Sequence, residues 1–328
     1  MTENNQIRSQ KFSSIQALRG LGAISVTIFH ALSLFPLVKF QAGAAGVDLF
    51  FIISGIVMCI SIKEGDNPLC FLKKRCIRVV PMYWIASATA VLYFYSRYPE
   101  MPPSFEHILR SFLFLPPPPS FNMPILYPGW SLNFEMFFYV ILSILLYAGR
   151  LAVPASMCLI ATLGTAMQGM EVIGKYYYSQ LLLEFVAGLA LGQAIKNGYT
   201  PKKREASIFL VTAISLMVLH SMNNSTGVLA WGIPCLFLTI GALGFEGSAF
   251  IKLRIIQFFG KSSYSIYLFH ALAIWMVDWI WPFQPGGAKV ISAVILSLVT
   301  GSFVFKFIEE PLLEIMRRHV KFQPTHRL

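Results

Sequence analysis

The sequence predicts an all-α polytopic membrane protein in which about ten helices cross the bilayer. Of its 328 residues, 56% are hydrophobic and 12% are charged, whereas an average soluble domain carries about 25% charged residues. The mean hydropathy of +0.63 is too high for a water-soluble globule. Apolar segments of about 20 residues, the length that crosses a hydrocarbon core about 30 Å thick, recur along the whole chain. These observations exclude a soluble protein and one held by a single anchor.

Ten apolar segments are separated by polar connectors. In chain order, the predicted spans are residues 14–34, 44–62, 79–95, 130–148, 152–169, 177–194, 206–222, 227–245, 262–281 and 288–307. They form one membrane domain over 14–307, between polar tails at 1–13 and 308–328. The first span lacks a small-residue cleavage site, so we expect it to be retained rather than removed as a signal peptide.

The distribution of lysine and arginine predicts the orientation. With these ten spans, 21 of the 26 lysines and arginines fall on the side of the N-terminus. The other five are Lys39, Arg97, Arg110, Lys175 and Lys289. By the positive-inside rule both termini are cytoplasmic and the number of crossings is even. The net charge of +11 therefore reflects topology, and no nucleic-acid partner is expected.

Two further features concern the connectors and the cysteines. The segment 96–129 contains four consecutive prolines from Pro116, which exclude a helix interior and favour an extended chain. We expect it on the outer side, as a lid or vestibule or as a stiff connector. The five cysteines include no Cys-x-x-Cys pair, so neither a disulfide framework nor a metal site is predicted.

Polar side chains at membrane depth are the functional candidates, because each costs about 2.5 to 3.5 kcal/mol to insert. Arg19 and His30 are eleven residues apart in the first span, which places them on one helix face and about 16 Å apart along its axis. Arg19 would lie at the cytoplasmic boundary and His30 well inside the bilayer. The alternative is a snorkelling arginine and a histidine that hydrogen-bonds a neighbouring helix.

The second and fourth spans carry carboxylates. Asp48 follows Gly46-Val47 near the outer end of an apolar helix, where it serves either a site or the positive end of the helix dipole. Ser131, Glu135 and Tyr139 are spaced by four residues and form one polar stripe. Trp130 beside them is typical of an interfacial aromatic residue.

Two more patterns add candidates. Arg75 and Arg78 would project together from a helix and could grip phosphate oxygens, with Tyr83 and Trp84 following them, whereas Lys73 and Lys74 are typical topology determinants. In the ninth span, Ser263, Tyr267 and His270 share one face, either as a functional stripe or as hydrogen-bonding contacts between helices. Glu184, Asp278 and the Glu309-Glu310-Pro311 exit of the last span are weaker signals.

Together these strings resemble the acyltransferase-3 family of integral membrane O-acyltransferases. The matching strings, in the family's order, are Arg19-x10-His30, Gly46-Val47-Asp48-Leu49-Phe50-Phe51, Arg75-x-x-Arg78 before Pro81-x-Tyr83-Trp84, Gly129-Trp130-Ser131-Leu132 with Glu135, and Ser263 to His270. The resemblance covers the whole chain and is closest to the branch that acetylates bacterial exopolysaccharides. Much of the family carries an aspartate where this chain has Gln16. The resemblance therefore does not decide whether the acceptor is an exopolysaccharide, O-antigen, enterobacterial common antigen or a Nod factor.

The resemblance implies an acetyltransferase of the bacterial cytoplasmic (inner) membrane, with acetyl-CoA as donor co-substrate and a carbohydrate acceptor. Arg75, Arg78 and Arg19 would bind the phosphates of coenzyme A, with Tyr83 and Trp84 beside them. His30 would act as general base with Glu135 orienting its imidazole, or would form a covalent acetyl-histidine intermediate. Asp48, Trp130, Ser131, Tyr139, Ser263, Tyr267 and His270 would serve the acceptor or support the site.

Two other classes of function are compatible with parts of the sequence. Intramembrane His, Glu and Asp also suit a transporter or flippase for a sugar or a lipid-linked glycan, although the chain shows no repeated half. A non-catalytic subunit of a polysaccharide synthase is the third possibility. Substitution of His30 or Glu135 would then change assembly rather than acetyl content.

Overall fold

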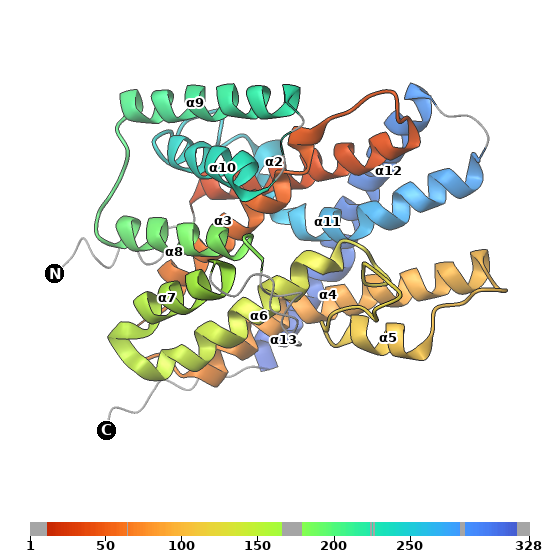
Figure 1. The fold of residues 1–328 in the computed structure, drawn as a ribbon, viewed down its shortest axis with the longest axis horizontal. Helices are drawn as coiled ribbons and strands as arrows, with labels where there is room; N and C mark the ends of the chain where they lie inside the picture. Colours follow the sequence, from red (N-terminus) through yellow and green to blue (C-terminus); the bar gives the residue numbers. More distant parts are fainter. Residues whose placement is uncertain are drawn as a thin grey trace.

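The structure is helical, as the sequence predicts. The computed structural model describes residues 12–319 except 64, 166–178, 224, 226 and 283–285, and all regular secondary structure in this part is helical (Figure 1). The helices are α2 (Ser13–Ala31), α3 (Gly46–Ser61), α4 (Pro68–Arg97), α5 (Phe105–Phe112), α6 (Gly129–Leu145), α7 (Ala152–Thr165), α8 (Leu182–Lys196), α9 (Lys203–Met222), α10 (Val228–Leu243), α11 (Arg254–Ile280), α12 (Gly287–Val304) and α13 (Glu310–His319). Shorter turns are η1 (Leu32–Leu34), η2 (Gln41–Gly43), η3 (Leu146–Leu151) and the π-helical η4 (Phe305–Glu309).

Each predicted span overlaps a helix in the described part of the chain. Six helical stretches are long and apolar enough to cross a membrane, namely Ser13–Leu34, Gln41–Ser61, Pro68–Arg97, Gly129–Thr165, Lys203–Met222 and Gly287–Arg318. The chain is therefore a multi-pass membrane protein, whereas the count of ten crossings and the cytoplasmic termini stay predictions. The end of the fifth predicted span, the start of the sixth, Lys175, residues 1–11 and residues 320–328 lie outside the described residues.

The helix that carries the two arginines is longer than the span predicted at 79–95. α4 begins at Pro68, where the Asn67 side chain accepts the N–H of Cys70 at 3.1 Å and proline occupies the first turn. Its 30 residues extend about 45 Å, well beyond the hydrocarbon thickness. Arg75 and Arg78 therefore lie on a regular helix, as their proposed joint projection requires.

Glycines allow the closest helix crossings. A Cβ atom at Gly20 of α2 would lie 2.9 Å from the backbone nitrogen of Gly260 in α11. A Cβ atom at Gly188 of α8 would clash with the carbonyl oxygen of Ile52 in α3. Small residues let helix backbones approach in this way in membranes, where lipid supplies no hydrophobic drive for association. The crossing at Gly20 holds α2 against α11. It therefore brings the helix of Arg19 and His30 next to the one that carries Ser263, Tyr267 and His270.

The connector between α4 and α6 folds back along α4. Tyr83 donates its hydroxyl hydrogen to the Ser111 carbonyl oxygen at 3.0 Å, and the Trp84 indole donates to that of Phe112 at 2.9 Å. Trp84 lies thirteen residues before the end of α4 at Arg97, which corresponds to about 20 Å along the helix. The connector is thus packed deep against protein, the condition under which irregular backbone is tolerated at membrane depth.

This contact bears on one sequence-based expectation. Tyr83 and Trp84 were expected beside the donor, but their polar atoms bind the connector and neither residue lines the cavity described below. The sequence placed them next to Arg78 along the chain, yet one helical turn or more separates their side chains from the arginine pair. Tyr83 and Trp84 therefore anchor the connector.

Candidate active site

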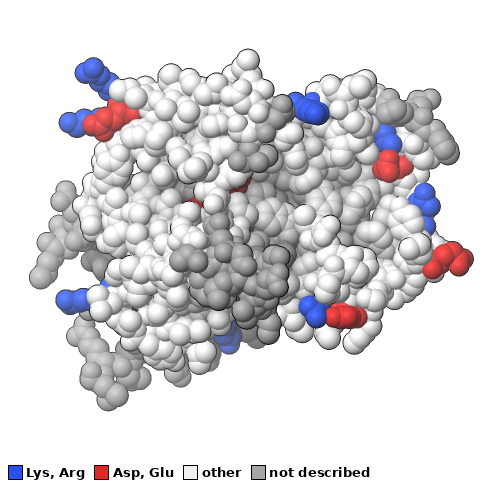
Figure 2. All heavy atoms as spheres, in the orientation of Figure 1, with Lys and Arg blue, Asp and Glu red and all other residues white. Residues whose placement is uncertain are grey.

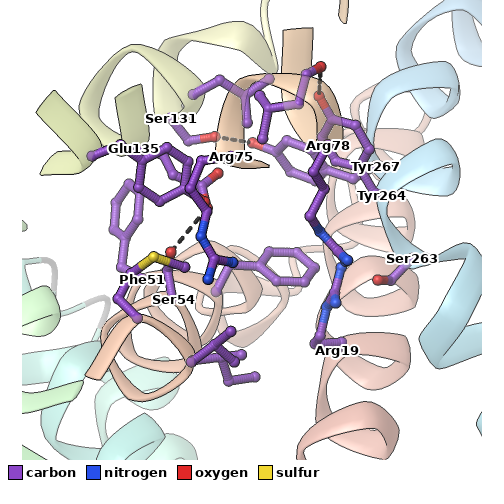
Figure 3. Close-up of a pocket in the computed structure, with 17 residues that line it drawn as sticks. Arg19, Phe51, Ser54, Arg75, Arg78, Ser131, Glu135, Ser263, Tyr264 and Tyr267 are labelled. Atoms are coloured by element: carbon purple, nitrogen blue, oxygen red, sulfur yellow. Dashed lines mark hydrogen bonds between the residues drawn. The ribbon is translucent and has the colours of Figure 1, made fainter. Parts of the chain in front are cut away.

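Three arginines and a glutamate converge in a cavity of about 140 Å³ inside the bundle (Figure 3). Helices α2, α3, α4, α6 and α11 form its walls. The polar residues that line it are Arg19, Ser54, Arg75, Arg78, Ser131, Glu135, Tyr139, Ser263, Tyr264 and Tyr267. The sequence predicted all of these except Ser54 and Tyr264 as site residues, and the structure brings these eight together.

The arginines give the cavity an excess of positive charge. Arg75 donates to the Ser61 hydroxyl at 2.6 Å, while Arg19 and Arg78 extend toward each other on the opposite side of the cavity (Figure 3). Glu135 is the acidic residue among those that line it. A lining with three guanidinium groups and one carboxylate is suited to an anionic ligand that offers several oxygens.

Glu135 is held by neutral side chains of two helices. Its carboxylate accepts a hydrogen bond from the Ser54 hydroxyl of α3 at 2.9 Å and another from the Tyr139 hydroxyl one turn along α6. Ser131, one turn in the other direction, hydrogen-bonds the Tyr267 hydroxyl at 2.7 Å. The stripe predicted on α6 thus faces the cavity along its length.

Two buried polar atoms in the cavity wall have no partner among the described residues. They are Nε of Arg75 and the hydroxyl oxygen of Ser263, and the latter residue is 0% exposed. Buried polar groups in native proteins are almost always paired, and those that are not call for an explanation such as a missing ligand. Both atoms belong to residues that line the cavity, which fits a cavity built to receive a polar molecule.

The structure adds Glu309, which gave only a weak functional signal in the sequence. Glu309 is 2% exposed and accepts a hydrogen bond from Ser265 of α11 at 2.5 Å. It is close enough to Arg19 and Arg78 for favourable electrostatic interaction with both. The π-helical turn η4 ends at this residue, and such turns often occur at functional sites. Because this turn departs from the α-helical period of 3.6 residues, helix periodicity in the sequence could not predict where Glu309 points.

His30 pairs with a second histidine, not with Glu135. The Nε2 atom of His270 lies 3.0 Å from Nδ1 of His30, and the two rings are stacked with their centroids 5.0 Å apart. His270 is 0% exposed, and its Nδ1 lies 2.6 Å from the carbonyl oxygen of Tyr267. The Tyr127 hydroxyl also reaches Nε2 of His270, at 3.2 Å. Glu135 contacts Ser54 and Tyr139 rather than His30, so orientation of His30 by Glu135 is not seen in this arrangement.

The histidine pair adjoins the cavity without lining it. His30 lies in the last turn of α2, nearer the end of the helix than expected, and its carbonyl oxygen is bound by the Ser33 hydroxyl at 2.6 Å. Tyr267 and Phe50, whose ring centroids are 5.6 Å apart, both line the cavity. His270 follows Tyr267 by three residues, so the cavity stops about one helical turn short of the pair.

Asp48 and Trp130 are not among the residues that line the cavity. Trp130 packs against Phe51, with centroids 6.3 Å apart. Asp48 is 8% exposed and lies beside Glu184 of α8, which is 2% exposed. The two carboxyl groups are close enough to interact electrostatically with each other. Asp48 is thus buried between α3 and α8, a position that suits a role in the packing of these helices.

Replacing Asp48 by asparagine should therefore stabilise the protein and preserve its activity. The new amide can donate a hydrogen bond to Glu184, which is worth about 1 kcal/mol in a typical case. Thermal unfolding in detergent and the rate of the reaction with saturating donor would be measured side by side. A variant that is stable yet inactive would show that Asp48 has a role in the active site.

Known proteins with similar sequences point to one family. The family model described as an acyltransferase domain matches residues 12–306. The chain is 31% identical to the exopolysaccharide production protein ExoZ of Rhizobium meliloti (strain 1021), over 84% of this chain and 90% of that protein. It is 20% identical to the acyltransferase MdmB of Streptomyces mycarofaciens, over 84% of this chain and 82% of that protein. A putative acetyltransferase of Acidianus two-tailed virus is 30% identical over 40% of each chain. No solved structure matches.

Proposed function

Because this chain belongs to the acyltransferase-3 family, we propose that it transfers an acetyl group from acetyl-CoA to a hydroxyl group of an exported or cell-surface polysaccharide. The similarity to a protein of exopolysaccharide production supports the carbohydrate acceptor. The observation that supports acetyl-CoA as the donor is the cavity with three arginines and unpaired buried polar atoms. We place the protein in the bacterial cytoplasmic membrane, with this cavity accessible from the cytoplasm.

In this proposal the arginines hold the anionic part of the donor. Arg75 and Arg78 lie one turn apart on α4, and Arg19 faces Arg78 from α2, so phosphate oxygens between them would receive paired charge-assisted hydrogen bonds. Glu309 would keep the Arg19 and Arg78 side chains extended toward the ligand rather than apart. The thioester end would point along the cavity toward Tyr267.

The histidine pair would supply the base. The Tyr267 carbonyl can only accept a hydrogen bond, so Nδ1 of neutral His270 carries the proton and its Nε2 accepts from Nδ1–H of His30. That tautomer leaves the lone pair on Nε2 of His30 free. Nε2 would take the proton of the acceptor hydroxyl while its oxygen attacks the thioester carbonyl; the carbon–sulfur bond breaks, and the thiolate recovers the proton. An acetyl group carried on Nε2 of His30 is the alternative course.

The proposal requires a small rearrangement at the end of the cavity. Tyr267 and Phe50 stand between the arginine-lined space and the histidines, so both rings would have to turn aside when the donor is bound. Tyr267 is also hydrogen-bonded to Ser131 and to the Pro128 carbonyl oxygen at 3.0 Å. Its movement would couple donor binding to the connector that contacts the histidines through Tyr127.

Reconstituted protein with labelled acetyl-CoA tests the proposed activity directly. We expect slow hydrolysis or transfer without a proton gradient, and a gain of about 42 Da per modified sugar in surface glycans only from cells that contain this chain, the mass of any added acetyl group. Gradient-driven sugar movement without loss of the acetyl group would establish a transporter instead. Unchanged glycans together with a lost partner complex would establish a non-catalytic subunit.

Replacing Arg78 by alanine should weaken donor binding more than it slows the chemical step. Loss of hydrogen bonds to a charged group costs about 1.5 to 3 kcal/mol, so KM for acetyl-CoA should rise by about tenfold to a hundredfold while kcat changes less. Lys73→Ala is the matched control, because Lys73 is exposed on the same helix and lies outside the cavity. An unchanged KM together with a large loss of kcat would contradict a role of Arg78 in donor binding.

A further inference from the structure

We propose that a groove along α2, separate from the arginine-lined cavity, binds one acyl chain of an anionic phospholipid. The groove has a volume of about 620 Å³ and lies between α2, α9, α10 and the beginning of α11. Ala17, Leu21 and Ile24 form its α2 wall, and Leu210 and Leu238 form walls from α9 and α10. None of its lining residues lines the arginine cavity, so this site stands apart from the proposed acyl transfer.

The dimensions of the groove suit a single acyl chain. It runs along α2 from Ser14 to Ile24, ten residues or about 15 Å, which is half of a hydrocarbon core about 30 Å thick. Its lining is apolar except for Ser14 and Ser248, which lie at one end. Leu21 and Phe250 on its edge are 49% and 71% exposed, and such surfaces are stable only against hydrocarbon. The groove thus spans one leaflet.

Positive charge gathers at the same end as the two serines. Lys252 and Arg254 come directly after Ile251, which lines the groove, and both are exposed. Gly244, at the end of α10, packs against Pro201, so the exposed Lys202, Lys203 and Arg204 at the start of α9 lie near the same end. Figure 2 shows lysine and arginine gathered at this end of α9 beside a single acidic side chain.

The acidic residues nearby do not cancel this charge. Glu246 is occupied by the start of α2, where its carboxylate accepts the backbone N–H groups of Ser13 and Ser14 at 2.8 and 2.9 Å. Glu205 accepts the backbone N–H of Lys202 at 3.1 Å. Five cationic side chains against these two carboxylates leave a net charge of +3 for an anionic headgroup, the complement that basic residues at a membrane surface provide.

The occupant is a phospholipid rather than a polyprenyl phosphate, because the groove is one leaflet long. A chain of ordinary fatty-acid length fills such a groove, whereas a polyprenyl chain continues far beyond it. An anionic phospholipid also supplies its phosphate at the depth of the first turn of α2, where the lysines and arginines lie.

Native mass spectrometry of the purified full chain tests the proposal. We expect one phosphatidylglycerol to be retained at least about tenfold more strongly than phosphatidylcholine with the same acyl chains. Ala17→Trp and Leu210→Trp fill the groove from opposite walls, and each should abolish the retained lipid. The double variant Lys252→Glu/Arg254→Glu should remove the preference for phosphatidylglycerol. Arg317→Glu/Arg318→Glu, on the exposed face of α13, is the control with an equal change of charge.

The outcomes separate clearly. Retention of lipid by both tryptophan variants, equal affinity for the two phospholipids, or stronger retention of an added polyprenyl phosphate would each overturn the proposal. Circular dichroism and gel filtration establish that each variant is folded. If neither tryptophan variant folds, the charge-reversed variant and its control decide the outcome through the lipid preference alone.

Discussion

Replacing His30 by alanine should abolish acyl transfer and leave a folded protein in the membrane. Loss of a general base typically slows a reaction by a factor of about 10² to 10⁴, and loss of a covalent carrier would stop it altogether. His30 is only half-buried, in the last turn of α2, so its removal creates little empty space. The expected result is a loss of turnover at unchanged thermal stability.

The measurement is the transfer of labelled acetyl from acetyl-CoA by protein reconstituted in lipid, with the amount in the membrane fraction determined in parallel. His220→Ala is the matched control, because His220 also lies in the last turn of a long helix, α9, and is remote from the cavity. We expect donor binding to survive in His30→Ala, because the arginines are intact. Retained acetylation by that variant would exclude His30 from the chemistry.

Helix periodicity was sufficient to predict the residues that share a wall of the cavity. Ser131, Glu135 and Tyr139 repeat at four-residue intervals, and the structure places all three along one face of α6. Arg75 and Arg78 were predicted to project together if their segment were helical, and α4 extends far enough to include them. Such relations lie within one helix, where a spacing of 3.6 residues per turn fixes direction.

Contacts between helices could not be predicted in this way. The hydrogen bond between His30 and His270 joins residues 240 positions apart, and that between Ser54 and Glu135 joins residues 81 apart. Which helices are neighbours depends on small residues such as Gly20 and on the path of the connectors, and no periodicity encodes either. The family resemblance implied Glu135 as the partner of His30, and spacing within one helix could not show that His270 contacts it.

The sequence also did not predict local departures from regular helical structure. The π-helical turn before Glu309 rotates that side chain inward, whereas an ideal helix read from the sequence gave no reason to place it beside the arginines. Tyr83 and Trp84 contact the connector, which the sequence predicted as an outer-side lid or vestibule or as a stiff connector without indicating what it packs against. Its backbone carbonyl groups, not any side-chain pattern, provide the contact.

Replacing His270 by alanine should reduce kcat by about a hundredfold or more and change KM for acetyl-CoA little. In the proposed arrangement His270 accepts the Nδ1–H of His30 through the 3.0 Å contact between them and so helps to fix its tautomer, and His270→Ala removes this acceptor. Residues that act as one unit give non-additive losses, so His30→Ala/His270→Ala should be no slower than His30→Ala alone. Steady-state kinetics of the three variants provide the comparison.

Glu135→Gln distinguishes the histidine pair from a histidine–carboxylate pair. The amide would keep an acceptor for Ser54 and Tyr139 but would remove the negative charge that faces the three arginines. We therefore expect a change in donor KM and only a modest change in kcat. Because His270 is fully buried, thermal unfolding of His270→Ala must be measured as well. A collapse of kcat in Glu135→Gln, with near-normal turnover in a folded His270→Ala, would restore Glu135 as the partner of the base and contradict the pairing in this structure.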